Sequence, residues 1–135
     1  MEPFPVTRIA HIQTTHDCPA WLVDNLWTDQ AVGFIGGTPK SCKTWLALEL
    51  AVAVASGLPC LGRFPVRQQG HVLMYAAEDS AETIKHRAAG IAKIRGIDDF
   101  ERLALGLITE PCLRLDHTEH QQRLAATLDR LKPRL

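Results

Sequence analysis

The sequence predicts an α/β fold in which helices flank a parallel sheet. Short apolar runs of strand length alternate along the chain with longer helix-forming segments, and glycine- or proline-containing stretches separate them. Such alternation is typical of β-α-β units, whose strands pair in parallel because each helix crosses over to the next strand. A polar loop that starts with two glycines also joins one apolar run directly to a helix, at residues 36–44.

The first half of the chain contains the strand and the helix on either side of this loop. Before them, residues 7–12 suggest a short strand and residues 19–26 suggest a helical turn. Residues 31–35 have the length and composition of the first main strand. The following helix, residues 44–56, is apolar nearly all round, and we therefore expect it to be buried until Gly57 ends it.

The second half of the chain continues the alternation of strands and helices. Ser80 is a suitable N-cap and Gly96 a suitable stop, so these two residues bound one of the helices. The elements expected there are a polar loop at 62–70, a strand at 71–77, a helix at 81–95, a strand at 103–109 and an amphipathic helix at 118–131. In such a sheet, ligands bind where the parallel strands end in the carboxyl direction.

The loop between residues 37 and 44 has the spacing of a phosphate-binding loop. The pattern G-x-x-x-x-G-K-[ST] is matched at its first glycine and at Lys43-Thr44, but Cys42 replaces the second glycine. A strand before the loop and a helix after it give the pattern its expected context. The residues expected to contact a bound phosphate chain are Gly36, Gly37, Thr38, Pro39, Lys40, Ser41, Cys42, Lys43 and Thr44.

The residue types of this loop suit a bound nucleotide. Backbone N–H groups converge on the phosphates, and the helix that follows points its positive end at them. Lys43 supplies a mobile positive charge, Thr44 offers a hydroxyl to Mg²⁺, and Gly37 permits a turn that a side chain obstructs. Cys42 brings a Cβ atom to a position that favours glycine, so we expect strain there. The alternative is an ordinary strand-turn-helix whose lysine follows a loop by chance.

Two adjacent carboxylates follow the strand predicted at residues 71–77. Glu78 and Asp79 come where this strand ends, at the edge of the sheet that binds ligands. One interpretation places Glu78 in the same crevice as Lys43, where it polarises an attacking water. In the other interpretation, both acids only cap the next helix, whose N-terminus is stabilised by negative charge. Spacing alone does not separate the two interpretations.

Composition argues against several classes of protein. Lys plus Arg and Asp plus Glu both number 15, so the chain has no overall basic field for nucleic acid. No apolar run reaches membrane length, and no signal-peptide pattern follows Met1. The cysteines form no C-x-x-C pair, which argues against a zinc site or a disulfide framework and favours reduced thiols in the cytoplasm. They are Cys18, Cys42, Cys60 and Cys112.

Two weaker patterns involve histidines and one basic helix. His117 and His120 are spaced at i and i+3 and suit a metal, but two ligands do not make a site. The helix at 81–95 is basic, and a solvated face is the simpler interpretation, with nucleic-acid binding as the alternative. Its basic residues are Lys85, His86, Arg87, Lys93 and Arg95.

The loop and the carboxylate pair together resemble a known family. The segments GGTPKSCKTWLALELAVAVASG and YAAEDS resemble the RecA-like P-loop ATPases of the AAA-type group, which includes plasmid-encoded hexameric replicative helicases. The resemblance covers residues 21–135 and is most specific in the loop. It implies that Lys43 and Thr44 bind ATP·Mg²⁺, with Thr44 on the metal, and that Lys43 and Glu78 are the catalytic residues. It also implies a homo-hexameric parent protein and a nucleic-acid partner.

The same resemblance implies further elements that this sequence does not contain. The family has a second metal-site aspartate at the end of a later apolar strand, and Asp116 fits that pattern poorly. We therefore expect the chain to be an N-terminal fragment of a larger ATPase. Residues 1–30 are then a leading segment, and residues 31–135 are a partial RecA-like ATP-binding domain with an incomplete sheet.

Three classes of function are compatible with these residues. The first is an ATPase whose hydrolysis drives nucleic-acid remodelling or replication, as Glu78 and the resemblance indicate. The second is a non-catalytic nucleotide-binding or interaction module, which Cys42 and the missing carboxylate favour. The third is a small-molecule kinase, although arginines for acceptor binding or for a lid are not evident in the sequence.

Overall fold

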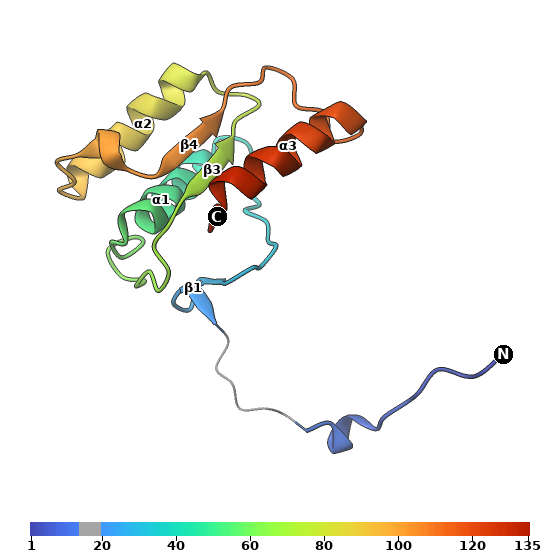
Figure 1. The fold of residues 1–135 in the computed structure, drawn as a ribbon. Coiled ribbons are helices and arrows are strands. Elements are labelled where there is room, and N and C mark those ends of the chain that lie inside the picture. Colours follow the sequence, from blue (N-terminus) through green and yellow to red (C-terminus); the bar gives the residue numbers. More distant parts are fainter. Residues whose placement is uncertain (14–19) are drawn as a thin grey trace.

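The computed structural model describes residues 1–13 and 20–135 of the chain. Its main body consists of α-helices packed on a small parallel sheet, whereas the first residues extend away from that body (Figure 1). The elements in chain order are η1 (Ile9–His11), β1 (Trp21–Val23), β2 (Trp27–Thr28), α1 (Lys43–Ser56), β3 (Val72–Tyr75), α2 (Ala81–Ile94), η2 (Phe100–Arg102), β4 (Leu105–Ile108) and α3 (Thr118–Leu131).

The predicted parallel sheet is confirmed by the pairing of β3 with β4. Val72 lies opposite Leu105 and Tyr75 opposite Ile108, with α2 as the crossover between the two strands. Both strands are shorter than the ranges predicted for them. This mixed α/β arrangement, with one parallel strand pair and three helices, is consistent with an incomplete P-loop NTPase fold, as the sequence predicted.

The sheet lies between two layers of helices. Met74 and Leu107 point to one face, where they pack with residues of α1 and α2. Because side chains alternate along a strand, Ile108 points to the other face, where it lines a hollow together with Leu124 of α3. The ribbon shows α1 and α2 behind the two strands and α3 in front of them (Figure 1).

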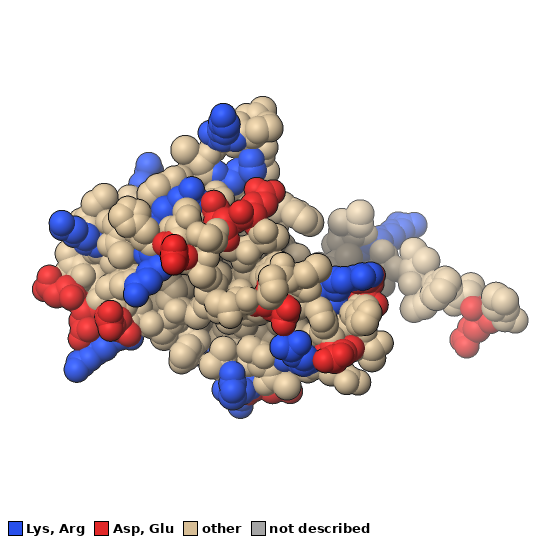
Figure 2. Space-filling model, turned by 90° about the horizontal axis from the view of Figure 1, so that it is seen from above, with Lys and Arg blue, Asp and Glu red and all other residues tan. Residues whose placement is uncertain are grey.

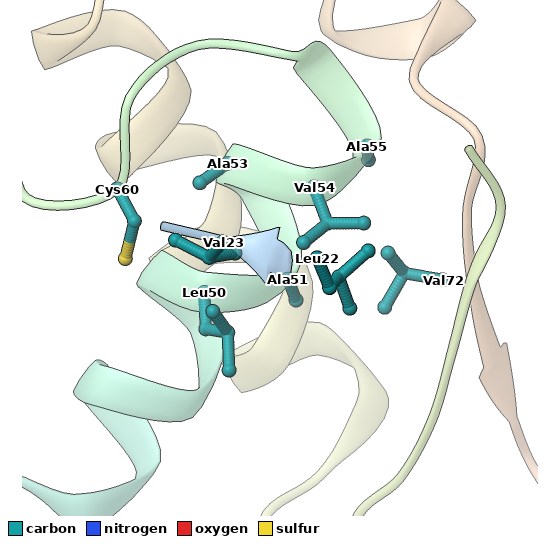
Figure 3. Close-up of a cluster of buried hydrophobic side chains, with 9 residues drawn as sticks. All are labelled: Leu22, Val23, Leu50, Ala51, Ala53, Val54, Ala55, Cys60 and Val72. Carbon is teal, nitrogen blue, oxygen red and sulfur yellow. The ribbon is translucent and has the colours of Figure 1, made fainter. Parts of the chain in front are cut away.

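Helix α1 forms the centre of the core. All eight residues from Leu48 to Ala55 are buried, which confirms the prediction of a helix that is apolar nearly all round. Leu22 and Val23 of β1 pack on this helix, together with Val72 of β3 (Figure 3). Each fully buried side chain of this size contributes about 1.5–3 kcal/mol through the hydrophobic effect. Strand β1 is therefore anchored in the same core as α1.

Gly57, Ser80 and Gly96 lie at helix ends, as the sequence predicted. Gly57 ends α1 in the left-handed conformation, with φ of 77°, and a Cβ atom there would lie 2.9 Å from Gln69 Oε1. Ser80 caps α2, because its Oγ accepts a hydrogen bond from the Thr83 amide at 3.2 Å. Gly96, with φ of 71°, follows the end of α2.

Two predictions for the first part of the chain are wrong. Residues 7–12 form no strand but contain the short 3₁₀-helix η1. Of the segment predicted as a helical turn, residue 19 lies outside the described residues, and the rest contains the strand β1. This strand pairs with β2 and also receives a hydrogen bond from Arg67, whose amide donates to the Leu22 carbonyl at 2.9 Å. Tertiary pairing therefore overrides the local pattern.

The strand predicted at residues 31–35 is also absent from the described structure. Val32 and Phe34 in this segment are 94% and 96% exposed. A strand forms only when its backbone groups have a partner, and no described strand lies beside this segment. The second edge of β3 is partly taken by the chain's last two residues. The Arg134 amide donates to His71 O at 2.7 Å, and the Leu73 amide donates to Leu135 O at 2.9 Å.

Within residues 1–13 and 20–135, no helix combines the length and the apolar character needed to cross a membrane.

Candidate functional site

A cleft of about 350 Å³ lies between the start of α1, the end of β3 and the start of α2. It brings together Lys43 and Thr44 from the loop side with Glu78 and Asp79 from the strand side. Among them, Lys43 and Glu78 are the two residues that one interpretation of the sequence placed in the same crevice. The other residues that line the cleft are Ile35, Ala47, Met74, Tyr75, Ala76, Ala77 and Ile84.

The loop before α1 is closed by hydrogen bonds to two of its own carbonyl groups. The Ser41 amide and the Ser41 hydroxyl both donate to the Thr38 carbonyl, at 3.3 Å and 2.7 Å. Lys43 Nζ donates to the carbonyl oxygens of Thr38 and Gly37, at 2.8 Å and 3.1 Å. The lysine side chain thus folds back over the loop, and its ammonium group lies where the loop carbonyls converge.

Backbone amides at the start of α1 are available to a ligand. In the described part of the chain, the amides of Lys43 and Thr44 make no hydrogen bond to other protein groups. Such amides at a helix N-terminus need an outside partner and favour an anion. The N-cap residue, Cys42, provides no side-chain cap that would compete for them.

Gly37 and Cys42 differ in what their positions demand. A Cβ atom on Gly37 would lie 2.5 Å from Ser41 Oγ, so a larger residue there would displace the Ser41 hydroxyl from its hydrogen bond with the Thr38 carbonyl. Gly36 has no atom within 4 Å of such a Cβ and therefore carries no steric requirement. Cys42 has φ of 62° and ψ of 23°, in the left-handed region. That conformation costs a residue with a Cβ roughly 1–2 kcal/mol, which agrees with the strain expected there.

The two adjacent carboxylates have different surroundings. Asp79 Oδ2 accepts a hydrogen bond from Arg87 Nη1 at 2.8 Å, and both side chains are about three-quarters buried. Glu78 is exposed and has no hydrogen-bond partner among the described residues. Ser80, rather than either acid, supplies the side-chain cap of α2. Glu78 is therefore the carboxylate that is free to interact with a ligand in the cleft.

Arg87 and Trp45 are two residues beside the cleft that sequence reasoning did not assign to it. The Arg87 guanidinium lies 5.6 Å from the centre of the Trp45 ring, which is a cation–π contact. It therefore links α2 to the first turn of α1 while it also binds Asp79. The sequence contains one indication of this contact, because Arg87 follows Asp79 by about two helical turns. The predicted helix has five basic residues, however, and nothing in the sequence distinguishes Arg87 from the other four.

The basic helix does not present all its charge to solvent. Arg87 is engaged by Asp79, and Arg95 forms an ion pair with the buried Glu49 of α1. Glu49 Oε1 also accepts a hydrogen bond from the Leu61 amide at 2.7 Å. On the face shown in Figure 2, positive and negative side chains are interspersed and do not form one basic patch. The interpretation of this helix as a uniformly solvated basic face is thus wrong for two of its arginines.

The remaining sequence candidates lie elsewhere. His117 and His120 have ring centres 5.6 Å apart, but the part of the chain that the structure describes holds no group of three or more metal-ligating side chains. Asp116 is paired with Arg114 at 2.7 Å, which lowers the pKa of its carboxyl group, and it does not line the cleft. Three of the cysteines, Cys42, Cys60 and Cys112, are free thiols, and Cys18 lies outside the described residues.

The fold and the cleft define a P-loop protein of the ATPase type. A glycine-containing loop precedes a helix whose first residues, Lys43 and Thr44, have unpaired amides in the described structure and line a cleft together with Glu78. The family model described as an AAA domain matches residues 2–135, and the chain belongs to this family. Comparisons with curated proteins and with solved structures found no match.

Proposed function

We propose that the chain binds ATP·Mg²⁺ in the cleft between α1 and the end of β3. The observation that carries this proposal is the meeting of Lys43 and Thr44 with Glu78 along one cleft, although 34 positions separate Thr44 and Glu78 in the sequence. Membership of the AAA domain family supports nucleotide binding in general terms. The free amides at the start of α1 are the groups that a phosphate chain needs.

Each residue of the cleft has a role in this proposal. The Lys43 ammonium group exchanges the carbonyls of Thr38 and Gly37 for the outer phosphates of the nucleotide. Thr44 offers its hydroxyl to Mg²⁺, which prefers oxygen ligands and keeps several waters. Backbone amides of the loop would complete the contacts with the phosphates, apart from Pro39, which has no N–H group, and Ser41, whose amide donates to the Thr38 carbonyl. The site therefore has the donor types that ATP·Mg²⁺ requires.

Glu78 is the residue that we propose for hydrolysis. As a free carboxylate in the cleft, it is suited to orient and deprotonate the water that attacks the terminal phosphate. Lys43 stabilises the charge that develops on the transferred phosphoryl group. We propose that the protein acts as a RecA-like, helicase-like cytoplasmic homo-hexamer in which hydrolysis would drive the remodelling or replication of nucleic acid.

A non-catalytic nucleotide-binding module is the second candidate. Cys42 favours it, because a strained residue in the loop reduces how easily the loop opens around phosphates. Asp79 supports it too, because this second carboxylate of the cleft is already occupied by Arg87. Binding and turnover therefore have to be measured separately.

The test compares ATP·Mg²⁺ binding by the wild-type chain and by Lys43→Ala in titration calorimetry. Lys43→Ala is expected to abolish binding, because Lys43 is the cation that the cleft contributes from the loop side. Lys93→Ala is the matched control, since this exposed lysine at the end of α2 is remote from the cleft and should bind as the wild type does. Equal affinity in the wild type and in Lys43→Ala would refute the site. Binding without turnover would favour the module over the ATPase.

A further inference from the structure

Arg87 holds one of the two neighbouring carboxylates of the cleft and leaves the other free. Its Nη1 atom donates to Asp79 Oδ2 at 2.8 Å, whereas Glu78 has no partner among the described residues. Both acids line the cleft that also contains Lys43. Without Arg87, the Asp79 carboxylate would add a second uncompensated negative charge next to the position that we propose for the phosphates of ATP.

The position of Arg87 is itself fixed from the loop side of the cleft. The guanidinium lies over the Trp45 ring at 5.6 Å, and Trp45 directly follows Thr44 in the first turn of α1. The side chain of Arg87 is 27% exposed, so it is partly shielded from water and its interaction with Asp79 is screened less than at an open surface. Arg87 thus contacts the residue next to Glu78 and the residue next to Thr44 at the same time.

We propose that Arg87 is a positioning residue that sets nucleotide affinity by neutralising Asp79 at the edge of the cleft. This inference rests on the proposed function, because it assumes that the phosphates of ATP lie near Lys43. The physical cause is repulsion between like charges, which is strong where water is partly excluded. Arg87 need not touch the nucleotide for this effect, and within the described part of the chain Glu78 remains the unpaired acid of the cleft.

The proposal predicts a specific order of affinities in titration calorimetry of the full chain. Arg87→Met should weaken ATP·Mg²⁺ binding about tenfold, because it uncovers Asp79. The double variant Arg87→Met/Asp79→Asn should recover wild-type affinity within about twofold, since it removes the uncovered charge as well. Arg87→Lys should retain most of the affinity, because the positive charge stays. Arg87→Met should also weaken ADP·Mg²⁺ binding by a smaller factor, as ADP carries less negative charge.

The control is Arg102→Met, which removes the same charge from an exposed pair with Asp99, outside the cleft. It should bind ATP·Mg²⁺ as the wild type does. A purely structural role for Arg87, through contact with Trp45, predicts instead that the double variant stays as weak as Arg87→Met, and that result overturns the inference. Unchanged affinity in Arg87→Met overturns it equally. If the wild-type chain binds neither nucleotide, the proposed function fails, and the inference falls with it.

Discussion

The ammonium nitrogen of Lys43 lies 2.8 Å from the carbonyl oxygen of Thr38 and donates a hydrogen bond to it. Lys43 Nζ donates a second hydrogen bond to the Gly37 carbonyl oxygen at 3.1 Å, so the lysine side chain is held against its own loop. A nucleotide that binds here has to replace both bonds with contacts from phosphate oxygens. Charge-assisted bonds to phosphate are stronger than bonds to neutral carbonyls, so the exchange is favourable.

The strained backbone of Cys42 predicts how substitutions there affect stability. Cys42→Gly relieves a left-handed conformation that costs roughly 1–2 kcal/mol, but glycine adds about 0.4–1 kcal/mol of unfolded-chain entropy. The net change in the free energy of unfolding should therefore be a stabilisation of between about 0 and 1.6 kcal/mol. Cys42→Val should destabilise instead, because a β-branched residue tolerates positive φ poorly. Urea denaturation of the three proteins decides this, and a Cys42→Val variant as stable as Cys42→Gly would contradict the strain.

Replacing Glu78 separates catalysis from helix stabilisation. In a form of the protein that turns over ATP, Glu78→Gln should bind nucleotide at least as tightly as the wild type, because it removes a free negative charge from the cleft, and should reduce turnover by about 10² to 10⁴-fold. Ser80→Ala is the matched control, because the Ser80 hydroxyl supplies the cap of α2. It should lower the free energy of unfolding by about 1 kcal/mol and leave turnover nearly intact. Melting temperature and phosphate release are measured on the same samples, and a Glu78→Gln variant that loses only stability would assign the residue to capping.

The exposed apolar residues of segment 31–35 predict self-association. Val32 and Phe34 are almost fully exposed in a segment that has strand composition but no strand partner in the described structure. Unpaired segments of this kind pair with other chains. The wild-type chain should therefore sediment as oligomers at high concentration, and Val32→Thr/Phe34→Asn should shift it towards monomer. Phe4→Ser, a change at an equally exposed residue of the N-terminal segment, should leave the distribution unchanged. A wild-type chain that stays monomeric would count against this expectation.

The Asp24–Arg67 ion pair predicts a stability change in acid. Arg67 holds the pKa of the Asp24 carboxyl group below its ordinary value of 3.8 by donating a hydrogen bond to it. Since folding lowers this pKa, the contribution to stability is present above pH 3.8 and is lost as the pH falls through the lower, folded value. Asp24→Asn should therefore be less stable than the wild type at neutral pH, and the difference should shrink towards pH 2. A difference that stays constant with pH would show that the charge contributes nothing.

Helices α1, α2 and α3 could be predicted from the sequence because their signals are local. Ser80 and Gly57 mark boundaries within a few residues, and the apolar character of α1 determines its burial whatever packs on it. Strands β3 and β4 were also evident, since each is a short apolar run between helices.

Other features could not be predicted because they depend on residues far apart in the chain. Strand β1 pairs with the nearby β2 but also contacts residues 66–67, more than 40 positions away, and no local pattern reveals this second partner. Segment 31–35 has the composition of a strand but lacks a neighbour in the described structure. Arg87 reaches Trp45 only because α1 and α2 pack together, so its place beside the cleft required the structure.

The hydrogen bonds along both edges of β3 give the two walls of the cleft unequal rigidity. One edge is paired with β4 and the other with Arg134 and Leu135, so the strand that leads to Glu78 is held from both sides. The loop that forms the other wall is attached to the fold through α1, and residues 31–35 before it belong to no strand pair in the described structure. In the proposed binding mode, a nucleotide would meet a carboxylate side that the sheet holds and a loop side that α1 and the loop's own hydrogen bonds hold, so more of the entropic cost of binding would fall on the loop side.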